Sequence, residues 1–485
     1  MYPDWQGQPA HRSILIRQGK VEALDPDEVP PHLPRLDFPA GVVLPGFVDD
    51  HVHLFHTGLT RFTVRLDEVK TWEEAAEALR AAQTELVLAT GLDEYRLDRL
   101  PDSPWLNRVL GGRPAFLKGI TGHYAVANRA ALDLLGIPDG TPGLDPATGY
   151  LRGTANTLAS RLARERLVAE EGPGPVLRAA AEMAARHGVT TLHALEGWDT
   201  PYPPEVLHLL QERDRLPVRT VVWPQTTHLP SVLELGLPRI GGDIWVDGDF
   251  GPRTARLREP YADGSGLGEL YYEPAFLADF ATRAVEAGLQ VAMHCVGDGA
   301  AEVALEAYRQ ALQQHPREDH RLRIEHFEVA APDLLERAAE LGVAVSLQPP
   351  FDSYFGGQQR ALPWAGPARV GRLDAVRSFL AAGLRCGGGS DSPVTPLDPL
   401  LGLDSCANHS NPDESVDIRT AIRLYTQGSA ALGFLEDQVG ALRPGMLGDL
   451  VVLDGDPFTI PSHEIRRLAV LATVVGGRLV YRRPV

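Results

Sequence analysis

The sequence is poor in cysteine and contains no long apolar run. Only three of its 485 residues are cysteines, Cys295, Cys386 and Cys406, and their spacing is too irregular for a disulfide framework. This scarcity predicts a reducing compartment. No basic and apolar leader follows Met1, so we expect a cytoplasmic protein. No apolar stretch approaches the roughly 18 residues that would suggest a membrane span, which argues against a membrane partner.

Positive charge is also scarce. The chain has 46 Lys and Arg residues against 64 Asp and Glu residues, for a formal net charge of −18. Nucleic acids and anionic membrane surfaces are bound by clustered Lys and Arg, so this balance excludes both as expected partners. The hydrophobic fraction of 44% and the charged fraction of 23% are normal for a soluble globular protein. A small-molecule substrate is the expected partner, and a homo-oligomer is left open.

From about residue 180 the sequence alternates short apolar runs with amphipathic stretches. In stretches such as 299–308 and 332–339 the apolar residues recur at intervals of three and four, as on one face of a helix. The predicted strands lie near residues 42–53, 188–195, 218–224, 243–248, 289–294, 322–326, 343–348 and 384–390. Eight strands linked by helices predict an α/β fold of the (β/α)₈ TIM barrel type.

Five polar residues lie at or just beyond the ends of these predicted strands. They are His51, His53, His294, His326 and Asp391. Residues i and i+2 of a strand point to the same face, so the two histidines of the His-Val-His pair can reach one ion. Such a pair alone is weak support for a metal site, but all five positions share the same context. A barrel would bring them together on its carboxyl-terminal rim, where barrel enzymes hold their active sites. The pattern predicts the metal site of a hydrolase.

The rest of the chain predicts two additions to the barrel. Residues 60–180 do not fit the strand count and are interpreted as an insertion after the first strand of a barrel that spans residues 46–437. The two chain ends, residues 1–45 and 438–485, contain short alternating strands. Each end is too small to bury a face alone, so we expect them to combine into one β-sandwich domain.

Several motifs resemble the metal-dependent amidohydrolase superfamily, in particular its amidohydrolase-3 (YtcJ-like) branch. The motifs are LPGFVDDHVH at 44–53, GHYAVANRAAL at 122–132, DG at 247–248 with RTA at 253–255, HCVGD at 294–298, SDSPV at 390–394 and GALRPGMLGDLVVL at 440–453. The similarity extends over nearly the whole chain. It implies a divalent metal, for which the imidazole-rich ligands favour zinc.

The chain departs from the family pattern at the fourth strand. Family members with two ions usually carry a carboxylated lysine there, four residues before the DG pair, and this chain has Asp243 at that position. Asp243 can ligate one ion, and Lys118 is the alternative substitute for the missing bridge. Without a bridge two dications repel each other strongly, so we favour one ion while leaving two open. In that case His51, His53 and His294 bind the ion beside Asp391.

The resemblance implies hydrolysis of a non-peptide carbon–nitrogen bond in an N-acyl, formamide or cyclic amide substrate. Asp391 would accept the proton of the attacking water and pass it to the leaving nitrogen, while His326 binds metal or orients the substrate carbonyl. His123 and Arg253 are candidate substrate contacts, the arginine for an anionic group. The alternatives are deamination of an aminated heterocycle or ester hydrolysis at the same site, and a non-catalytic scaffold with an amidohydrolase-like fold.

Overall fold

The computed structural model describes residues 1–4, 6–7, 9, 11–31, 33–66, 69–93, 99–120, 122 and 124–484. The chain divides into two compact units. Unit 1 comprises Met1–Leu54 and Ala181–Val485, and unit 2 comprises Phe55–Ala180. Within the described ranges, no helix is both long enough and apolar enough to cross a membrane.

Unit 1 is built on two parallel sheets whose strands alternate with helices along the chain. The three-stranded sheet has the order β12 (Arg219–Pro224), β11 (Val189–Glu196), β4 (Phe47–Val52). The five-stranded sheet has the order β13 (Arg239–Ile240), β14 (Gln290–Cys295), β15 (Arg323–His326), β16 (Ala344–Leu347), β17 (Arg385–Gly388). This arrangement confirms the predicted α/β class.

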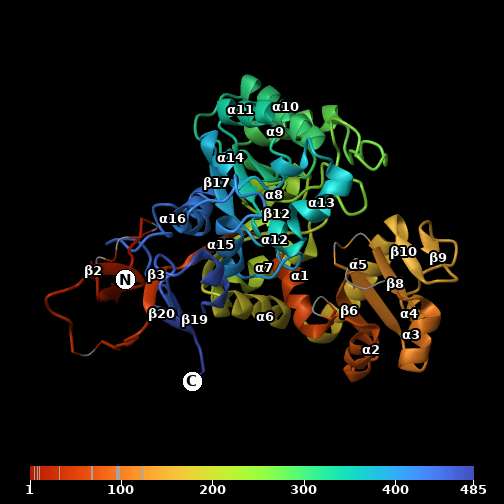
Figure 1. Cartoon of the computed structure of the whole chain (residues 1–485), viewed down its shortest axis with the longest axis horizontal. Coiled ribbons are helices and arrows are strands. Elements are labelled where there is room, and N and C mark those ends of the chain that lie inside the picture. The colour runs from red at the N-terminus through yellow and green to blue at the C-terminus, as the bar shows by residue number, and fades with distance from the viewer. Residues whose placement is uncertain are drawn as a thin grey trace. The chain divides into compact units, whose positions relative to one another are not determined.

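The strands of both sheets are buried on both faces. Every residue of β4, β11, β15 and β16 is buried, as expected for parallel strands covered by helices. Helices α9 (Pro274–Glu286), α10 (Asp298–Gln314) and α11 (Pro332–Leu341) lie together beside the five-stranded sheet (Figure 1).

The remaining helices of unit 1 connect or flank the strands. They are α7 (Pro204–Glu212), α8 (Leu229–Glu234), α12 (Pro350–Tyr354), α13 (Gly357–Ala365), α14 (Val376–Ala381), α15 (Pro399–Ala407), α16 (Ile418–Arg423) and α17 (Ser429–Leu432). Helices α1 (Leu54–Leu59) and α6 (Pro173–Arg186) cross the boundaries with unit 2.

The two parallel sheets share a packed interior. Trp223 of β12 and Ala292 of β14 belong to the same buried apolar cluster. At the other edges, a single parallel bridge joins Val52, at the end of β4, to Ser392, just beyond β17. Among the described residues no ladder of hydrogen bonds joins the sheets, so the closed barrel expected from the sequence is not seen as one continuous sheet.

The fourth predicted strand is wrong in position. The sequence predicted a strand over residues 243–248, but β13 ends at Ile240, and Trp245 makes only one isolated bridge, to His294. The physical reason is a glycine turn. Gly241 and Gly242 both have positive φ angles, 89° and 57°, which no extended strand can accommodate. Asp243 therefore follows a turn at the carboxyl end of β13.

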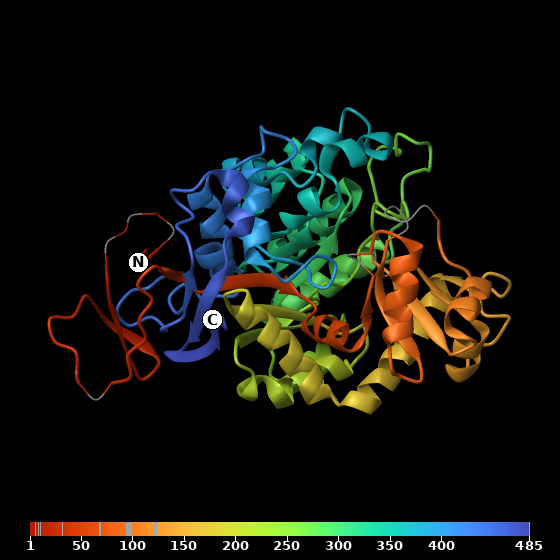
Figure 2. The same cartoon turned by 60° about the horizontal axis from the view of Figure 1, so that its bottom comes forward.

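The two chain ends share one antiparallel sheet. Strand β3 (Val42–Pro45) pairs with β18 (Leu450–Leu453), followed in the sheet by β19 (Val470–Val475) and β20 (Arg478–Arg482). Figure 2 shows the blue carboxyl-terminal strands beside the red amino-terminal strand. Strands β1 (Ile14–Arg17) and β2 (Lys20–Leu24) form a separate hairpin, which touches the carboxyl-terminal segment through a bridge between Lys20 and Leu447.

Unit 2 is a six-stranded mixed sheet with helices. Its strand order is β5 (Val64–Arg65), β6 (Val87–Leu92), β7 (Ala115–Gly119), β8 (Tyr124–Ala127), β10 (Tyr150–Arg152), β9 (Leu144–Asp145). Its helices are α2 (Trp72–Ala81), α3 (Ser103–Leu110), α4 (Arg129–Leu134) and α5 (Gly153–Glu171). Asn128 caps α4 by accepting from the amide of Ala131, and the same oxygen accepts from the amide of Ala115 at the start of β7.

Candidate metal centre

The ends of five parallel strands of unit 1 deliver six potential metal ligands to one place. These ligands are His51 of β4, His53 just after it, Asp243 after β13, His294 of β14, His326 of β15 and Asp391 after β17. The five residues singled out from their strand ends are thus close together, and Asp243 joins them.

The loop that carries Asp391 is fixed to β4 by backbone hydrogen bonds. The amide of Asp391 donates to the carbonyl of His51 at 2.7 Å, and the amide of His53 donates to the carbonyl of Ser392 at 3.0 Å. Asp391 and His326 have φ angles of 53° and 68°, a region that costs free energy for any residue other than glycine. Backbone strain of this kind persists where surrounding structure holds a functional side chain in place.

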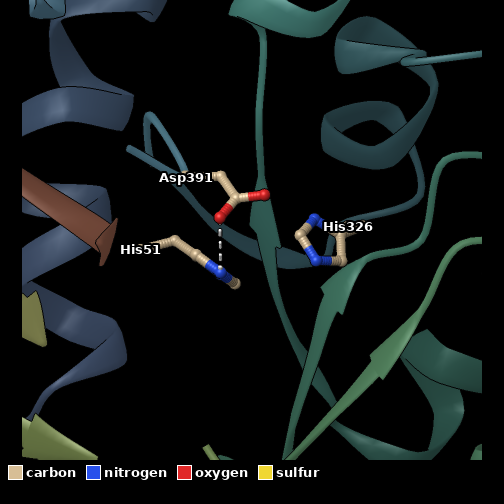
Figure 3. A group of neighbouring side chains, drawn as sticks. All are labelled: His51, His326 and Asp391. Carbon is tan, nitrogen blue, oxygen red and sulfur yellow. Dashed lines mark ion pairs between the residues drawn. The ribbon is translucent and has the colours of Figure 1, made fainter. Parts of the chain in front are cut away.

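One group of donors gathers around His51 and His53. Oδ1 of Asp391 lies 3.2 Å from Nε2 of His53 and 3.4 Å from Nε2 of His51. Oδ2 of Asp243 approaches Nε2 of His53 to 3.5 Å. Figure 3 shows the contact between His51 and Asp391 as a dashed line, with His326 on the other side of the carboxylate.

A second group gathers around the other oxygen of Asp243. Its Oδ1 lies 3.4 Å from Nδ1 of His294 and 3.4 Å from Nε2 of His326. Oδ1 of Asp243 is also 3.8 Å from Nε2 of His51. Asp243 therefore belongs to both groups, one with His51 and His53 and the other with His294 and His326.

Four of these donor atoms are buried and make no hydrogen bond. They are Nε2 of His51, Nδ1 of His294, Oδ1 of Asp243 and Oδ1 of Asp391. Buried polar atoms are almost always satisfied, so a cluster of four such atoms pointing together indicates a site suited to a cation. The side chains of His53 and His294 keep 16% and 12% of their surface exposed, whereas that of His51 is fully buried.

The donor spacing fits a tetrahedral metal ion. Two ligands about 2.1 Å from an ion at the tetrahedral angle lie about 3.4 Å apart. Three imidazole–carboxylate distances in the first group, 3.2, 3.4 and 3.5 Å, and both distances in the second, 3.4 Å each, match this edge length, whereas the 3.8 Å between His51 and Asp243 is longer. Imidazole and carboxylate together are a ligand set that suits zinc and its first-row neighbours.

The electrostatics of the metal-free cluster also favour a cation. Burial alone would lower the pKa of His51, but the carboxylates of Asp391 and Asp243 raise it well above its usual value. Burial would also lower the pKa of His294, but the carboxylate of Asp243 raises it to about 9. Burial would raise the pKa of Asp391, but His51 and His53 hold it well below its usual range. Burial, together with His294, lowers the pKa of His326.

Each of three histidines is oriented by an acceptor on its other ring nitrogen. Nδ1 of His51 lies 2.7 Å from Oε2 of Glu325, and Nδ1 of His326 lies 2.8 Å from Oε1 of Gln348. Nδ1 of His53 lies 2.9 Å from the carbonyl oxygen of Leu195. These contacts place the proton on Nδ1 and make Nε2 the nitrogen that faces the carboxylates and can ligate a metal, as at most protein metal sites.

A buried ion pair supports the contact to His51. The guanidinium of Arg323 donates to both oxygens of Glu325, at 2.5 and 2.6 Å, and both side chains are completely buried. Arg323 also donates to the carbonyl of Asp50 at 2.6 Å and lies 3.0 Å from Nδ1 of His193. Sequence analysis missed Arg323, Glu325 and Gln348. The signal was available, since two opposite charges inside a short buried strand next to a ligand are unusual.

Arg253 is not among the ligands of this cluster. The guanidinium of Arg253 bonds Asp263 at 2.7 Å and the carbonyls of Phe250 and Gly251 at 2.5 and 3.0 Å. Its role as a substrate contact stays a prediction. Lys118 lies in β7 of unit 2, and its role as an alternative bridge stays a prediction. His123 lies outside the described residues.

Comparisons with known proteins agree with this site. A family model described as the amidohydrolase family matches residues 40–481. YtcJ of Bacillus subtilis (strain 168) is 29% identical over 517 residues, which cover 97% of this chain and 94% of YtcJ. N-substituted formamide deformylase of Arthrobacter pascens is 26% identical over 538 residues, which cover 97% of this chain and 95% of that enzyme. The crystal structure of an uncharacterized metal-dependent hydrolase from Pyrococcus horikoshii OT3 superposes with a TM-score of 0.79 and 26% identity, covering 95% of this chain and 97% of that one.

The fold and the cluster are those of a metal-dependent hydrolase. The chain belongs to the amidohydrolase family. The predicted resemblance is therefore confirmed, as is the prediction of an enzyme that hydrolyses carbon–nitrogen bonds, and the family implies a small-molecule substrate.

Proposed function

We propose that this enzyme hydrolyses a non-peptide carbon–nitrogen bond in an N-acyl, formamide or cyclic amide substrate. The observation that carries the proposal is the cluster of four imidazoles and two carboxylates, with four buried donor atoms that make no hydrogen bond. The deformylase activity in the name of the Arthrobacter pascens relative supports the choice of an amide.

A bound divalent ion, zinc in this proposal, lowers the pKa of water toward 7 and polarises a carbonyl oxygen. His51, His53, His294 and His326 would hold the metal, together with Asp243 and Asp391. Asp391 is the general base, accepting the proton of the attacking water and then donating it to the leaving nitrogen. Its Oδ1 faces His51 and His53, so Oδ2 takes the proton; in Figure 3 this second oxygen points away from His51.

Aromatic rings flank the cluster on two sides. Phe351 stacks on the ring of His326, with centroids 5.8 Å apart and an interplanar angle of 18°. Trp245 lies 6.4 Å from the ring of His294 and packs edge-to-face against Trp198 at 5.6 Å. Such rings bind apolar or planar substituents, which supports a substrate with an apolar group near the scissile bond.

The catalytic unit in this proposal is a (β/α)₈ barrel spanning residues 46–437, with an insertion at about 60–180. Two observations support one barrel: the interior cluster shared by β12 and β14, and the bridge from Val52 to Ser392. The pairing of β3 with β18 supports a composite β-sandwich domain from residues 1–45 and 438–485.

The test is a substrate screen with metal-free and zinc-loaded protein. N-formyl, N-acyl and lactam panels are assayed for released amine or acid beside aminoheterocycle and ester panels. Metal-dependent turnover on the amide panels, lost in Asp391→Asn, is the expected result. Asp249→Asn is the matched control, because it makes the same substitution at a carboxylate that is not among the ligands of the cluster. The Asp249 carboxylate instead accepts from the amide of Phe250.

Three other outcomes would contradict the proposal. Ammonia release from aminoheterocycles alone would favour the deaminase alternative, and turnover of esters alone would favour an esterase. Zinc binding without turnover on any panel would favour the non-catalytic scaffold. The presence of His51, His53 and Asp391 argues against a scaffold, because a non-catalytic protein does not need them.

A further inference from the structure

We infer that Asp243 is an unmodified bridging carboxylate between two divalent ions, so that this enzyme assembles a binuclear site without a carboxylated lysine. The inference rests on the proposed function, because it concerns the same metal centre. It departs from our expectation from the sequence, in which Asp243 ligates one ion and a single ion is favoured.

The two oxygens of Asp243 face different histidines. Oδ2 lies 3.5 Å from His53, whereas Oδ1 lies 3.4 Å from both His294 and His326 and 3.8 Å from His51. If Asp243 served a single ion, its two oxygens would both face one pair of histidines, and the other pair would lie beside a different acidic residue. Here one carboxylate is the acidic member of both ligand groups.

Each group is sufficient for one ion. His51, His53, Asp391 and Asp243 supply four ligands, a full tetrahedral set. His294, His326 and Asp243 supply three, which leaves a position for water or substrate, as in catalytic metal sites. Two dications a few ångströms apart repel each other strongly unless negative charge lies between them, and Asp243 supplies that charge.

The glycine turn explains how so short a side chain reaches both groups. A lysine in a strand would reach the ions through its long side chain. Here β13 ends at Ile240, and the turn that follows places the backbone of Asp243 close to the cluster, so a short side chain is enough. The turn is packed tightly. A Cβ on Gly241 would lie 2.2 Å from the carbonyl oxygen of Ala292, and one on Gly242 would lie 3.1 Å from that of Trp223.

The carbonyl of Asp243 is held as well. Nε2 of Gln225 donates to it at 2.6 Å. Close packing on both sides of the turn and this hydrogen bond fix the backbone of Asp243. The fixed backbone in turn holds the carboxylate between the two pairs of histidines. The side chain is 3% exposed, which removes competition from bulk water.

The experiment measures zinc stoichiometry of the full-length protein by titrating the metal-free form and analysing bound metal after gel filtration. It is done in carbon dioxide-free buffer and again with added bicarbonate. Wild-type protein should bind about two equivalents in both conditions, and Asp243→Asn about one, since the amide cannot neutralise a second dication. Asp243→Glu should keep about two, since it retains the carboxylate, and Asp249→Asn is the matched control and should also bind about two.

A second readout does not depend on activity. Wild-type protein loaded with manganese should give the spin-coupled electron paramagnetic resonance signal of a bridged pair, and Asp243→Asn should give the signal of an isolated ion. If Asp243→Asn fails to fold by circular dichroism, the bicarbonate independence and the coupled signal of the wild type still decide the matter.

The outcomes separate this inference from the proposed function. A wild type that hydrolyses amides with about one equivalent of zinc would overturn the bridge and leave the proposed function standing. Loading that requires bicarbonate, or a carbon dioxide adduct on a lysine in the mass spectrum, would also overturn the bridge. Failure to bind zinc at all would overturn both.

Discussion

Glu325→Gln tests whether the buried acceptor behind His51 sets the strength of the metal site. The carboxylate of Glu325 accepts from Nδ1 of His51 at 2.7 Å and is completely buried. An imidazole that donates to a charged acceptor is a stronger metal ligand than one that donates to a neutral acceptor. Loss of such an acceptor typically weakens metal binding by about 10- to 100-fold. We therefore expect a loss of about 1.4–2.8 kcal/mol in zinc affinity at the site that contains His51.

The single substitution also leaves Arg323 without its anionic partner. Breaking a buried ion pair from one side costs about 3–5 kcal/mol of stability, a large part of the about 5–15 kcal/mol that a protein has. The double variant Arg323→Gln/Glu325→Gln removes that unpaired charge. It should be more stable than the single variant, measured by urea unfolding of the metal-free proteins, while its zinc affinity stays equally weak.

Zinc affinity is measured by competition with a chelating dye at neutral pH. Glu436→Gln is the control, because Glu436 also pairs with an arginine, Arg321 at 2.6 Å, but its side chain is 34% exposed. Its zinc affinity should not change. A folded Glu325→Gln protein with zinc affinity within about twofold of the wild type would refute the reasoning, since the acceptor would then have no influence on the ligand.

Three further predictions concern the base, the metal and pH. Asp391→Asn should lower kcat by at least about 100-fold in a turnover assay while zinc stays bound, because an amide cannot accept the water proton; a loss of less than about tenfold would mean that another group is the base. Removing the metal with a chelator should abolish hydrolysis and lower the melting temperature, by an amount equivalent to about 2.7 kcal/mol when free zinc had been at about 100 times its dissociation constant, and zinc should restore both. The stability of the metal-free protein should fall as pH rises from about 6.5 through about 9. Burial lowers the pKa of His294, but Asp243 raises it to about 9, so the folded state holds that proton more tightly than the unfolded chain does. This contribution to stability is lost once the pH passes the pKa of His294 in the folded state. His294→Gln should flatten that part of the pH profile of the thermal midpoint, and an unchanged profile would exclude His294 as its source.

The positions of the histidines could be predicted because they depend on local pattern. His51, His294 and His326 lie in or at the end of short apolar strands, and the strands of two parallel sheets with a shared interior bring their carboxyl ends together. Two sequence signals, period-two alternation and apolar runs between helices, were therefore enough to group them. Asp391 followed from the same rule, although it lies in the loop after its strand.

The position of Asp243 could not be predicted in this way. The run from Asp243 to Gly248 has the composition of a strand, and the two preceding glycines allow either an extended chain or a turn. What decides is the close contact of Gly241 and Gly242 with the carbonyls of Ala292 and Trp223, which belong to neighbouring strands. Tertiary packing of that kind leaves no periodic trace in the sequence.

The two halves of the proposed binuclear centre are not electrostatically equal. The ion beside His51 and His53 would share Asp243 and have Asp391 to itself, whereas the ion beside His294 and His326 would have only its share of Asp243. The first ion thus has one more negative ligand, and Coulomb attraction over such short distances makes it the more tightly held. We expect stepwise chelation to remove the ion at His294 and His326 first, which X-ray anomalous scattering from a half-depleted crystal can locate. Depletion of the His51 and His53 position first would show that the second carboxylate does not set the order of binding.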